Sequence, residues 1–129
     1  MKVLLVIALG MGVAAAGVRP GAEAAPGGEV RVMEVQDTAG KAIFLGKGLC
    51  HACHGPDAKG TALAPDLTDP EWLHADGTLE TVAKVVKEGV AQPKKFPAPM
   101  LPMGGAQLTD DEVQAVARYV VALSAKTEN

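Results

Sequence analysis

Aromatic side chains and cysteines are both scarce in this chain of 129 residues. Phe, Trp and Tyr together make up 3% of the sequence, so large flat side chains cannot fill much of a core. There are only two cysteines, and they lie three residues apart. A domain of about a hundred residues is marginal on hydrophobic burial alone. The composition therefore favours a small fold that gains stability from a bound group.

An excess of positive charge and the usual catalytic groupings are also missing. The chain has 12 Lys and Arg against 15 Asp and Glu, for a net charge of −3. Nucleic-acid-binding domains present clustered basic residues, so we expect no nucleic-acid partner. The sequence contains no Ser-His-Asp set, no phosphate-binding loop and no cluster of carboxylates. Enzymes that depend on those groups are therefore excluded.

The N-terminal apolar run, residues 3–18, is shorter than the roughly 20 residues of a membrane-spanning helix. It follows Met1-Lys2, and Ala22-Glu23-Ala24 then fits the small-x-small pattern of a cleavage site. This pattern predicts a secretory signal peptide and export to the periplasm, with a retained membrane anchor facing the periplasm as the alternative. The predicted division of the chain is a signal peptide over residues 1–24, a flexible tail over 25–37 and a folded domain over 38–126.

Helical patterning occurs in three stretches, and no stretch shows the alternation of a strand. Residues 38–48 and 78–89 each combine apolar helical spacing with a glycine at the end. Residues 108–124 begin with Thr109 and Glu112 in the spacing of a capping box. The Gly- and Pro-rich segments between them leave room for one helical turn near Trp72. We predict an all-α fold of three to four helices, with long loops wrapped around something.

The segment Cys50-His51-Ala52-Cys53-His54 has the spacing C-x-x-C-H, the attachment pattern of haem c. Two thiols three residues apart on a helical turn can reach two vinyl groups on one edge of a porphyrin and form thioethers. His54 is then placed to supply an imidazole nitrogen as an axial ligand of the iron. The sequence therefore predicts one covalently attached haem c, held by Cys50, Cys53 and His54.

Two other uses of the cysteines fit less well. A disulfide between Cys50 and Cys53 would close a very short loop and restrain little of the unfolded chain. A tetrahedral zinc site would need both cysteines and two of His51, His54 and His74, which lack the usual paired spacing of such ligands. Haem attachment remains the best interpretation of the motif.

Four segments in this order give the chain a resemblance to the class I c-type cytochromes: GKGLCHACHG, APDLTDPEWL, PMLPMGGAQLTDDEV and AVARYVVALS. The similarity covers about residues 38–125 and is greatest to small monohaem bacterial proteins and to the haem-c domains of respiratory oxidases. It implies the cytochrome c fold, in which the terminal helices cross and loops enclose one haem. It also implies that the Pro65 carbonyl accepts a hydrogen bond from the second nitrogen of His54.

The same resemblance implies that Met100 is the sixth ligand of the iron. Counted back from Leu108, Met100 takes the ligand position and Met103 a later apolar one, although Leu101 stands where proline is usual. Several prolines around Met100 would stiffen its backbone. Met103 and His74 remain the alternative ligands, and His51 is expected to be exposed.

The remaining predictions concern packing and charge. The helix crossing is expected to involve Phe44, Tyr119 and Val120. Four lysines near the methionine segment either surround the haem edge and steer an acidic partner or form a solvated face; they are Lys84, Lys87, Lys94 and Lys95. The residues expected to line the haem are Leu67, Trp72, Val82, Val86 and Leu123.

A haem with both axial positions filled by protein has no open site for a substrate, so the predicted function is electron transfer rather than catalysis. The expected partners are redox proteins, namely a cytochrome, an oxidase or a dehydrogenase, between which the protein would shuttle single electrons. The first alternative is a fixed haem-c subunit of a dehydrogenase, oxidase or photosynthetic complex. The second is a gas-binding or peroxidatic haem protein, which requires an open sixth position.

Overall fold

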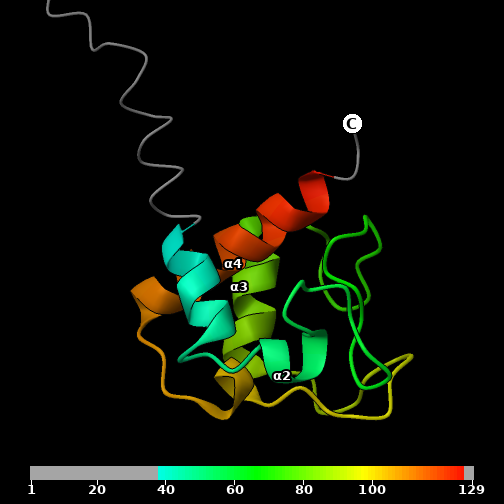
Figure 1. Ribbon diagram of the computed structural model, residues 1–129. Helices are drawn as coiled ribbons and strands as arrows, with labels where there is room; N and C mark the ends of the chain where they lie inside the picture. Colours follow the sequence, from blue (N-terminus) through cyan, green and yellow to red (C-terminus); the bar gives the residue numbers. More distant parts are fainter. Residues whose placement is uncertain (1–37, 127–129) are drawn as a thin grey trace, which may run out of the picture.

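The computed structural model describes residues 38–126, which form helices joined by long loops (Figure 1). The predicted signal peptide and tail, residues 1–37, lie outside the described residues. Within residues 38–126, an isolated antiparallel bridge joins Val90 and Met100, and there is no β-strand. The all-α prediction is therefore confirmed. In chain order the helical elements are residues 38–45, α2 (His51–His54), α3 (Leu79–Glu88), the 3-10 helix η1 (Pro102–Gly105) and α4 (Asp110–Ala125).

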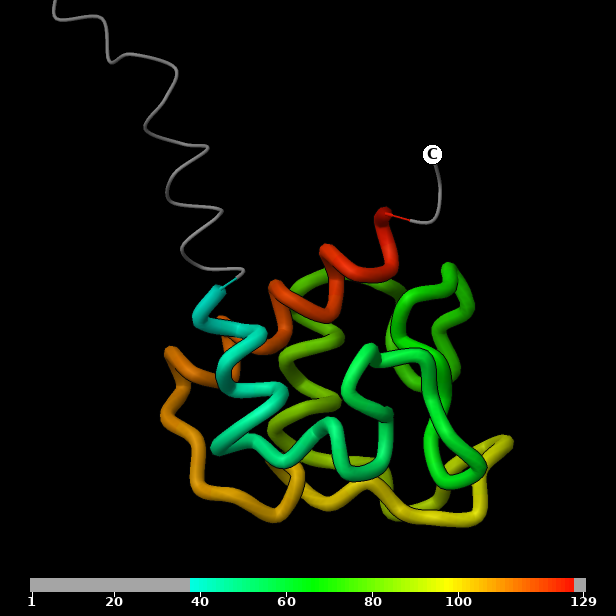
Figure 2. Tube along the Cα trace, viewed as in Figure 1, coloured from blue at the N-terminus to red at the C-terminus, as the bar shows by residue number. Residues whose placement is uncertain are grey.

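Two longer helices and the first helical segment form the frame, and the loops cover one side of it. Figure 1 shows residues 38–45 in cyan beside α4 in red, with α3 packed against α4. In the trace of Figure 2, the segment after α2 and the yellow segment after α3 run around the remaining sides of the molecule. This arrangement leaves the single turn of α2 between the helical frame and the loops.

The ends of α3 and α4 follow from their capping residues. At the start of α4, Thr109 Oγ1 accepts from the Glu112 N–H at 3.2 Å, and the Glu112 carboxylate accepts from the Thr109 N–H at 2.8 Å. This reciprocal pair is the predicted capping box. The helix α3 ends at Gly89, with φ of 71°, whose N–H donates to the Val85 carbonyl at 2.8 Å. Both helix ends were predictable because the capping signals are local.

Two helix predictions were wrong in detail. The first helix, expected to reach residue 48, ends at residue 45 and continues as a turn over residues 46–48. The helical turn expected near Trp72 does not form, because aspartates in this region bond the backbone in turns instead. The side chain of Asp69 accepts from the Glu71 N–H at 3.0 Å, and that of Asp76 accepts from the Thr78 N–H at 2.9 Å.

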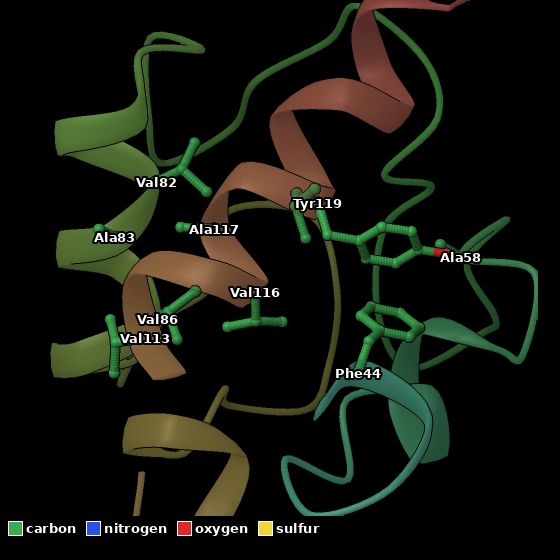
Figure 3. Close-up of a cluster of buried hydrophobic side chains, with 10 residues drawn as sticks. Phe44, Ala58, Val82, Ala83, Val86, Val113, Val116, Ala117 and Tyr119 are labelled. Atoms are coloured by element: carbon green, nitrogen blue, oxygen red, sulfur yellow. The ribbon is translucent and has the colours of Figure 1, made fainter. Parts of the chain in front are cut away.

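Residues 38–45 cross α4 in close contact within the core. Phe44 is fully buried and meets Tyr119 edge to face, with ring centroids 5.7 Å apart (Figure 3). Val120 belongs to the same buried cluster, so the predicted crossing is confirmed. A Cβ built on Gly40 would lie 2.3 Å from the Ala115 carbonyl oxygen and 2.6 Å from the Tyr119 Cβ. Only glycine allows the two helices this close an approach.

We predict that Gly40→Ala destabilises the protein by about 1–3 kcal/mol, because the added methyl group forces the helices apart. Denaturant unfolding would measure the loss. The control is Lys41→Ala, which changes an exposed neighbour on the same helix and should alter the free energy of unfolding by less than about 0.5 kcal/mol. Equal stability of the two variants would show that the crossing is not tight at Gly40.

Candidate functional site

An apolar cavity of about 340 Å³ lies between the helical frame and the loops. This volume falls in the range of roughly 300–1,000 Å³ that is common for small-molecule pockets. The cavity is lined by side chains from all parts of the fold, including Phe44 from the first helical segment, Val82 and Val86 from α3, and Val116 from α4. The structure therefore provides a mostly apolar cavity next to the C-x-x-C-H motif.

All four residues predicted to bind the cofactor line this one cavity. Cys50, Cys53 and His54 reach it from α2 and the residue before α2, and Met100 reaches it from the loop after α3. The methionine is thus brought next to the motif from about fifty positions further along the chain. The set contains two thiols, one imidazole and one thioether, which matches the donors that a covalent haem with two protein axial ligands requires.

The cysteines are presented by a single turn of helix. The N–H of His54 donates to the Cys50 carbonyl at 3.0 Å, and that of Cys53 donates to the same oxygen at 3.3 Å. Left-handed residues bound this turn, with φ of 53° at Leu49 and 80° at Gly55. Cys53 is exposed, whereas Cys50 is half-buried, and burial raises the pKa of the Cys50 thiol. The turn thus holds both thiols at the cavity.

His54 is buried and fixed by one hydrogen bond. Its Nδ1 lies 3.0 Å from the Pro65 carbonyl oxygen, so Nδ1 carries the proton and donates it. This contact confirms the one that the resemblance implied. Burial lowers the pKa of His54, although the bond to Pro65 opposes the effect, so the neutral imidazole is favoured at neutral pH. The unprotonated Nε2 is then available as a ligand atom.

The methionine segment is held by a pair of backbone hydrogen bonds. The Val90 N–H donates to the Met100 carbonyl at 2.8 Å, and the Met100 N–H donates to the Val90 carbonyl at 3.0 Å. Met103 lies in η1 with φ of 53° and packs against the buried core, but it is not among the residues that line the cavity. The structure thus separates the two candidate methionines and places Met100 at the cavity.

The other histidines have partners of their own. His74 lines the cavity, and its Nε2 accepts from the Lys94 N–H at 3.3 Å. The prediction that His51 is exposed was wrong, because the turn before α2 folds this residue back on the first helix. His51 is half-buried, with Nδ1 3.3 Å from the Phe44 carbonyl oxygen. Within residues 38–126, no three His, Cys, Asp or Glu side chains come together as a metal-binding group, so the zinc alternative has no ligand set there.

The cavity walls agree with most of the packing predictions. Leu123 is the exception, since it packs against the buried core and does not line the cavity. Three leucines missed in the sequence also line the cavity while remaining exposed, namely Leu49 at 52%, Leu63 at 46% and Leu101 at 57%. They mark its opening, and no periodic pattern in the sequence connects them. The predicted wall residues that do line it are Leu67, Trp72, Val82 and Val86.

Three of the four lysines near the methionine segment bond to their own chain. Lys87 pairs with Asp110 at 2.6 Å, and Lys95 pairs with Glu71. The Lys94 ammonium donates to the Leu73 carbonyl at 2.6 Å. No lysine or arginine is among the residues that line the cavity in the described part of the chain. The cavity lining is thus mostly apolar, and its charged members, Asp66 and Glu71, are acidic.

The comparisons with known proteins agree with this geometry. The cytochrome c family model matches residues 38–124. The chain is 38% identical over 93 residues to the cbb3-type cytochrome c oxidase subunit CcoP of Rubrivivax gelatinosus, covering 69% of this chain and 28% of that protein. It is 34% identical over 91 residues to subunit CcoP of Rhodobacter capsulatus, with shares of 67% and 30%.

A further relative is subunit FixPc of Rhizobium leguminosarum bv. viciae, which is 37% identical over 91 residues, with shares of 69% and 28%. The chain thus spans less than a third of the length of these curated relatives. No solved structure matches significantly. Because the family model covers two thirds of the sequence and includes the motif, the helix crossing and the methionine segment, the chain belongs to the cytochrome c family.

Proposed function

We propose that this protein carries one covalently attached haem c and transfers single electrons, with His54 and Met100 as the axial ligands. The observation that supports the proposal best is the convergence of Cys50, Cys53, His54 and Met100 on one apolar cavity. Haem supplies a metal centre that accepts and releases one electron. In this proposal the protein is an electron carrier and not itself an enzyme.

The residues of the chain have distinct roles in this proposal. Cys50 and Cys53 form the thioethers, and His54 binds through Nε2 while its Nδ1–H stays bonded to Pro65. The Met100 thioether fills the sixth position and favours the reduced state, which raises the reduction potential. The mostly apolar walls would place few polar groups next to the metal when its charge changes.

The proposed partners are redox proteins, and two arrangements remain. In one, the protein shuttles electrons as a free carrier between a cytochrome, a dehydrogenase or an oxidase. The other, a fixed haem-c subunit, is favoured by the relatives, which are subunits of cbb3-type oxidases. In both arrangements the partner would approach the exposed leucines at the cavity opening, Leu49, Leu63 and Leu101.

The proposed location is the periplasm. It depends on the signal peptide predicted over residues 1–24, and membrane attachment would follow only if that segment is retained. None of the helices between residues 38 and 126 has the length and apolar character needed to cross a bilayer. A gas-binding function would require an open sixth position, and the placement of Met100 at the cavity favours electron transfer instead.

We predict that protein produced with a cytochrome c maturation system gains the mass of one haem, which survives acid–acetone extraction. Thioether bonds to Cys50 and Cys53 are stable under conditions that remove a haem held only by its ligands. Mass spectrometry of the wild type and of a Cys50→Ala, Cys53→Ala variant would measure it. Release of the haem from the wild type into the organic phase would contradict the proposal.

The same double variant is predicted to be largely unfolded by circular dichroism. Without the cofactor, the apolar residues that line the cavity from three helical elements would have no group to pack against. A domain of this size buries too little other apolar surface to compensate. The control is Cys53→Ala alone, which retains one thiol for attachment and should keep most of its helical signal. A cooperatively folded double variant would show that the fold does not depend on the haem.

Met100→Ala is predicted to remove the weak long-wavelength absorption band that marks Met–Fe ligation in similar proteins. It should also lower the reduction potential and allow carbon monoxide to bind, because the thioether that fills the sixth position is gone. The matched control is Met103→Ala. This variant should keep the band and lose less than about 2 kcal/mol of stability, since Met103 is only half-buried. The opposite result would assign the ligand to Met103, and an unchanged band in both variants would point to His74.

A further inference from the structure

The loop after α2 contains a polar cluster, centred on the buried Thr68, that the proposed function has not used. We name it the Lys59–Thr68–Asp66 cluster. The Lys59 ammonium donates to Thr68 Oγ1 at 2.6 Å, and that hydroxyl donates to Asp66 Oδ1 at 2.6 Å. The Thr68 N–H donates to the same carboxylate oxygen at 2.7 Å. Thr68 is only 9% exposed, and a buried hydroxyl with such partners fixes the backbone around it.

This cluster lies next to the carbonyl that orients His54. Asp66 follows Pro65 directly, so the turn closed by the Asp66–Thr68 bonds begins at the peptide group whose oxygen accepts from His54 Nδ1. On its other side this peptide is bounded by Gly60. A Cβ on Gly60 would lie 2.7 Å from the Pro65 carbonyl carbon and 2.6 Å from the Asp66 nitrogen.

One backbone bond connects the same loop to α2, and another closes the loop on itself. The Gly60 N–H donates to the His54 carbonyl at 2.8 Å, and the Leu67 N–H donates to the Ala58 carbonyl at 2.8 Å. Lys59 lies next to both bonds in the sequence, and its ammonium donates to Thr68 in the part of the loop that runs back toward α3. The loop is thus held at its base by backbone bonds and at its far side by the cluster.

We infer that Lys59, Thr68 and Asp66 are positioning residues, which hold the Pro65 carbonyl against His54 and so set how strongly this imidazole donates to the iron. A carbonyl that accepts from Nδ1–H makes the other ring nitrogen a better donor, and a stronger donor favours the oxidised metal. Loosening the cluster should therefore weaken the donor and shift the reduction potential upward. The inference rests on the proposed role of His54 as a ligand.

The charges of Lys59 and Asp66 are consistent with the directions of the hydrogen bonds in the cluster. Burial alone would raise the pKa of Asp66, but its bonds from Thr68 and the charge of Lys59 outweigh burial and lower that pKa. Asp66 is therefore ionised at neutral pH and acts only as an acceptor, while Thr68 accepts from Lys59 and donates to Asp66. The Thr68 hydroxyl thus serves as both acceptor and donor within the cluster.

The test uses Thr68→Val in the full, haem-loaded protein, because this change removes the hydroxyl without altering charge. Two quantities are measured: the reduction potential, and the solvent exchange of the His54 Nδ1 proton by NMR in the reduced state. We expect the exchange rate of this proton to rise about tenfold. This rise corresponds to a loss of about 1.4 kcal/mol in the stability of the state in which the proton is bonded to Pro65. The potential should shift upward, and Thr68→Ser should restore both values because it keeps the hydroxyl.

The matched control is Thr81→Val at the start of α3. Thr81 Oγ1 also donates to an aspartate, Asp76, but the side-chain hydrogen bonds of Thr81 join only Asp76 and Thr78 and not the loop that carries Pro65. It should reduce stability while leaving the potential and the His54 exchange unchanged. If Thr68→Val behaves like Thr81→Val, the cluster is merely structural and the inference is overturned.

Lys59→Met separates positioning from simple electrostatics. Loss of a positive charge near the metal would by itself lower the potential, whereas loosening of Pro65 raises it and speeds His54 exchange. Faster exchange supports the inference, and a lower potential with unchanged exchange overturns it for Lys59. If the wild type shows no iron-bound His54 in its NMR spectrum, the proposed function fails. If His54 is bound to the iron but Thr68→Val changes neither the reduction potential nor the exchange of the His54 Nδ1 proton, the positioning role of the cluster is refuted and the proposed function stands.

Discussion

The hydrogen bond from His54 to the Pro65 carbonyl is the contact on which the rest of the site depends. It joins the single turn that presents the cysteines to the loop that covers them, and it selects which ring nitrogen remains open toward the cavity. One turn of helix is too short to hold its own shape. It is fixed from outside, by this bond and by the Thr61 hydroxyl, which donates to the Cys53 carbonyl at 2.6 Å.

The helix crossing gives this site a rigid base. Phe44 packs on Tyr119 at the crossing and also lines the cavity, so the same side chain belongs to the core and to the cofactor space. The scarcity of aromatics noted in the sequence has a physical counterpart here. One aromatic pair fills the crossing, and the other two aromatics, Trp72 and Phe96, line the cavity together with valines and leucines. In a domain this small, a bound planar group would supply the missing packing.

Local signals predicted much of this structure, and contacts distant in sequence account for what they missed. The capping box of Thr109 and the C-x-x-C-H motif each lie within a few residues, so they could be read directly. His51 is half-buried because the glycine-containing turn before α2 places it against the first helix, and no residue near His51 in the sequence predicts this contact. The pairing of Val90 with Met100 likewise joins two loop segments that have no strand pattern. Such a contact becomes apparent only once the helices are packed.

Leu101 shows how the fold keeps a local geometry after the usual residue is replaced. The resemblance places proline at this position, yet Leu101 has φ of −71° and ψ of 147°, which a proline would also adopt. The backbone at Leu101 therefore has a conformation that proline would also allow. Rigidity comes instead from the two bonds between Val90 and Met100, and from Gly89, where a Cβ would lie 2.4 Å from the Met100 carbonyl oxygen. The Leu101 side chain is exposed and lines the cavity, so at this position the chain adds an apolar group at the cavity opening while Val90 and Gly89 fix the backbone of Met100.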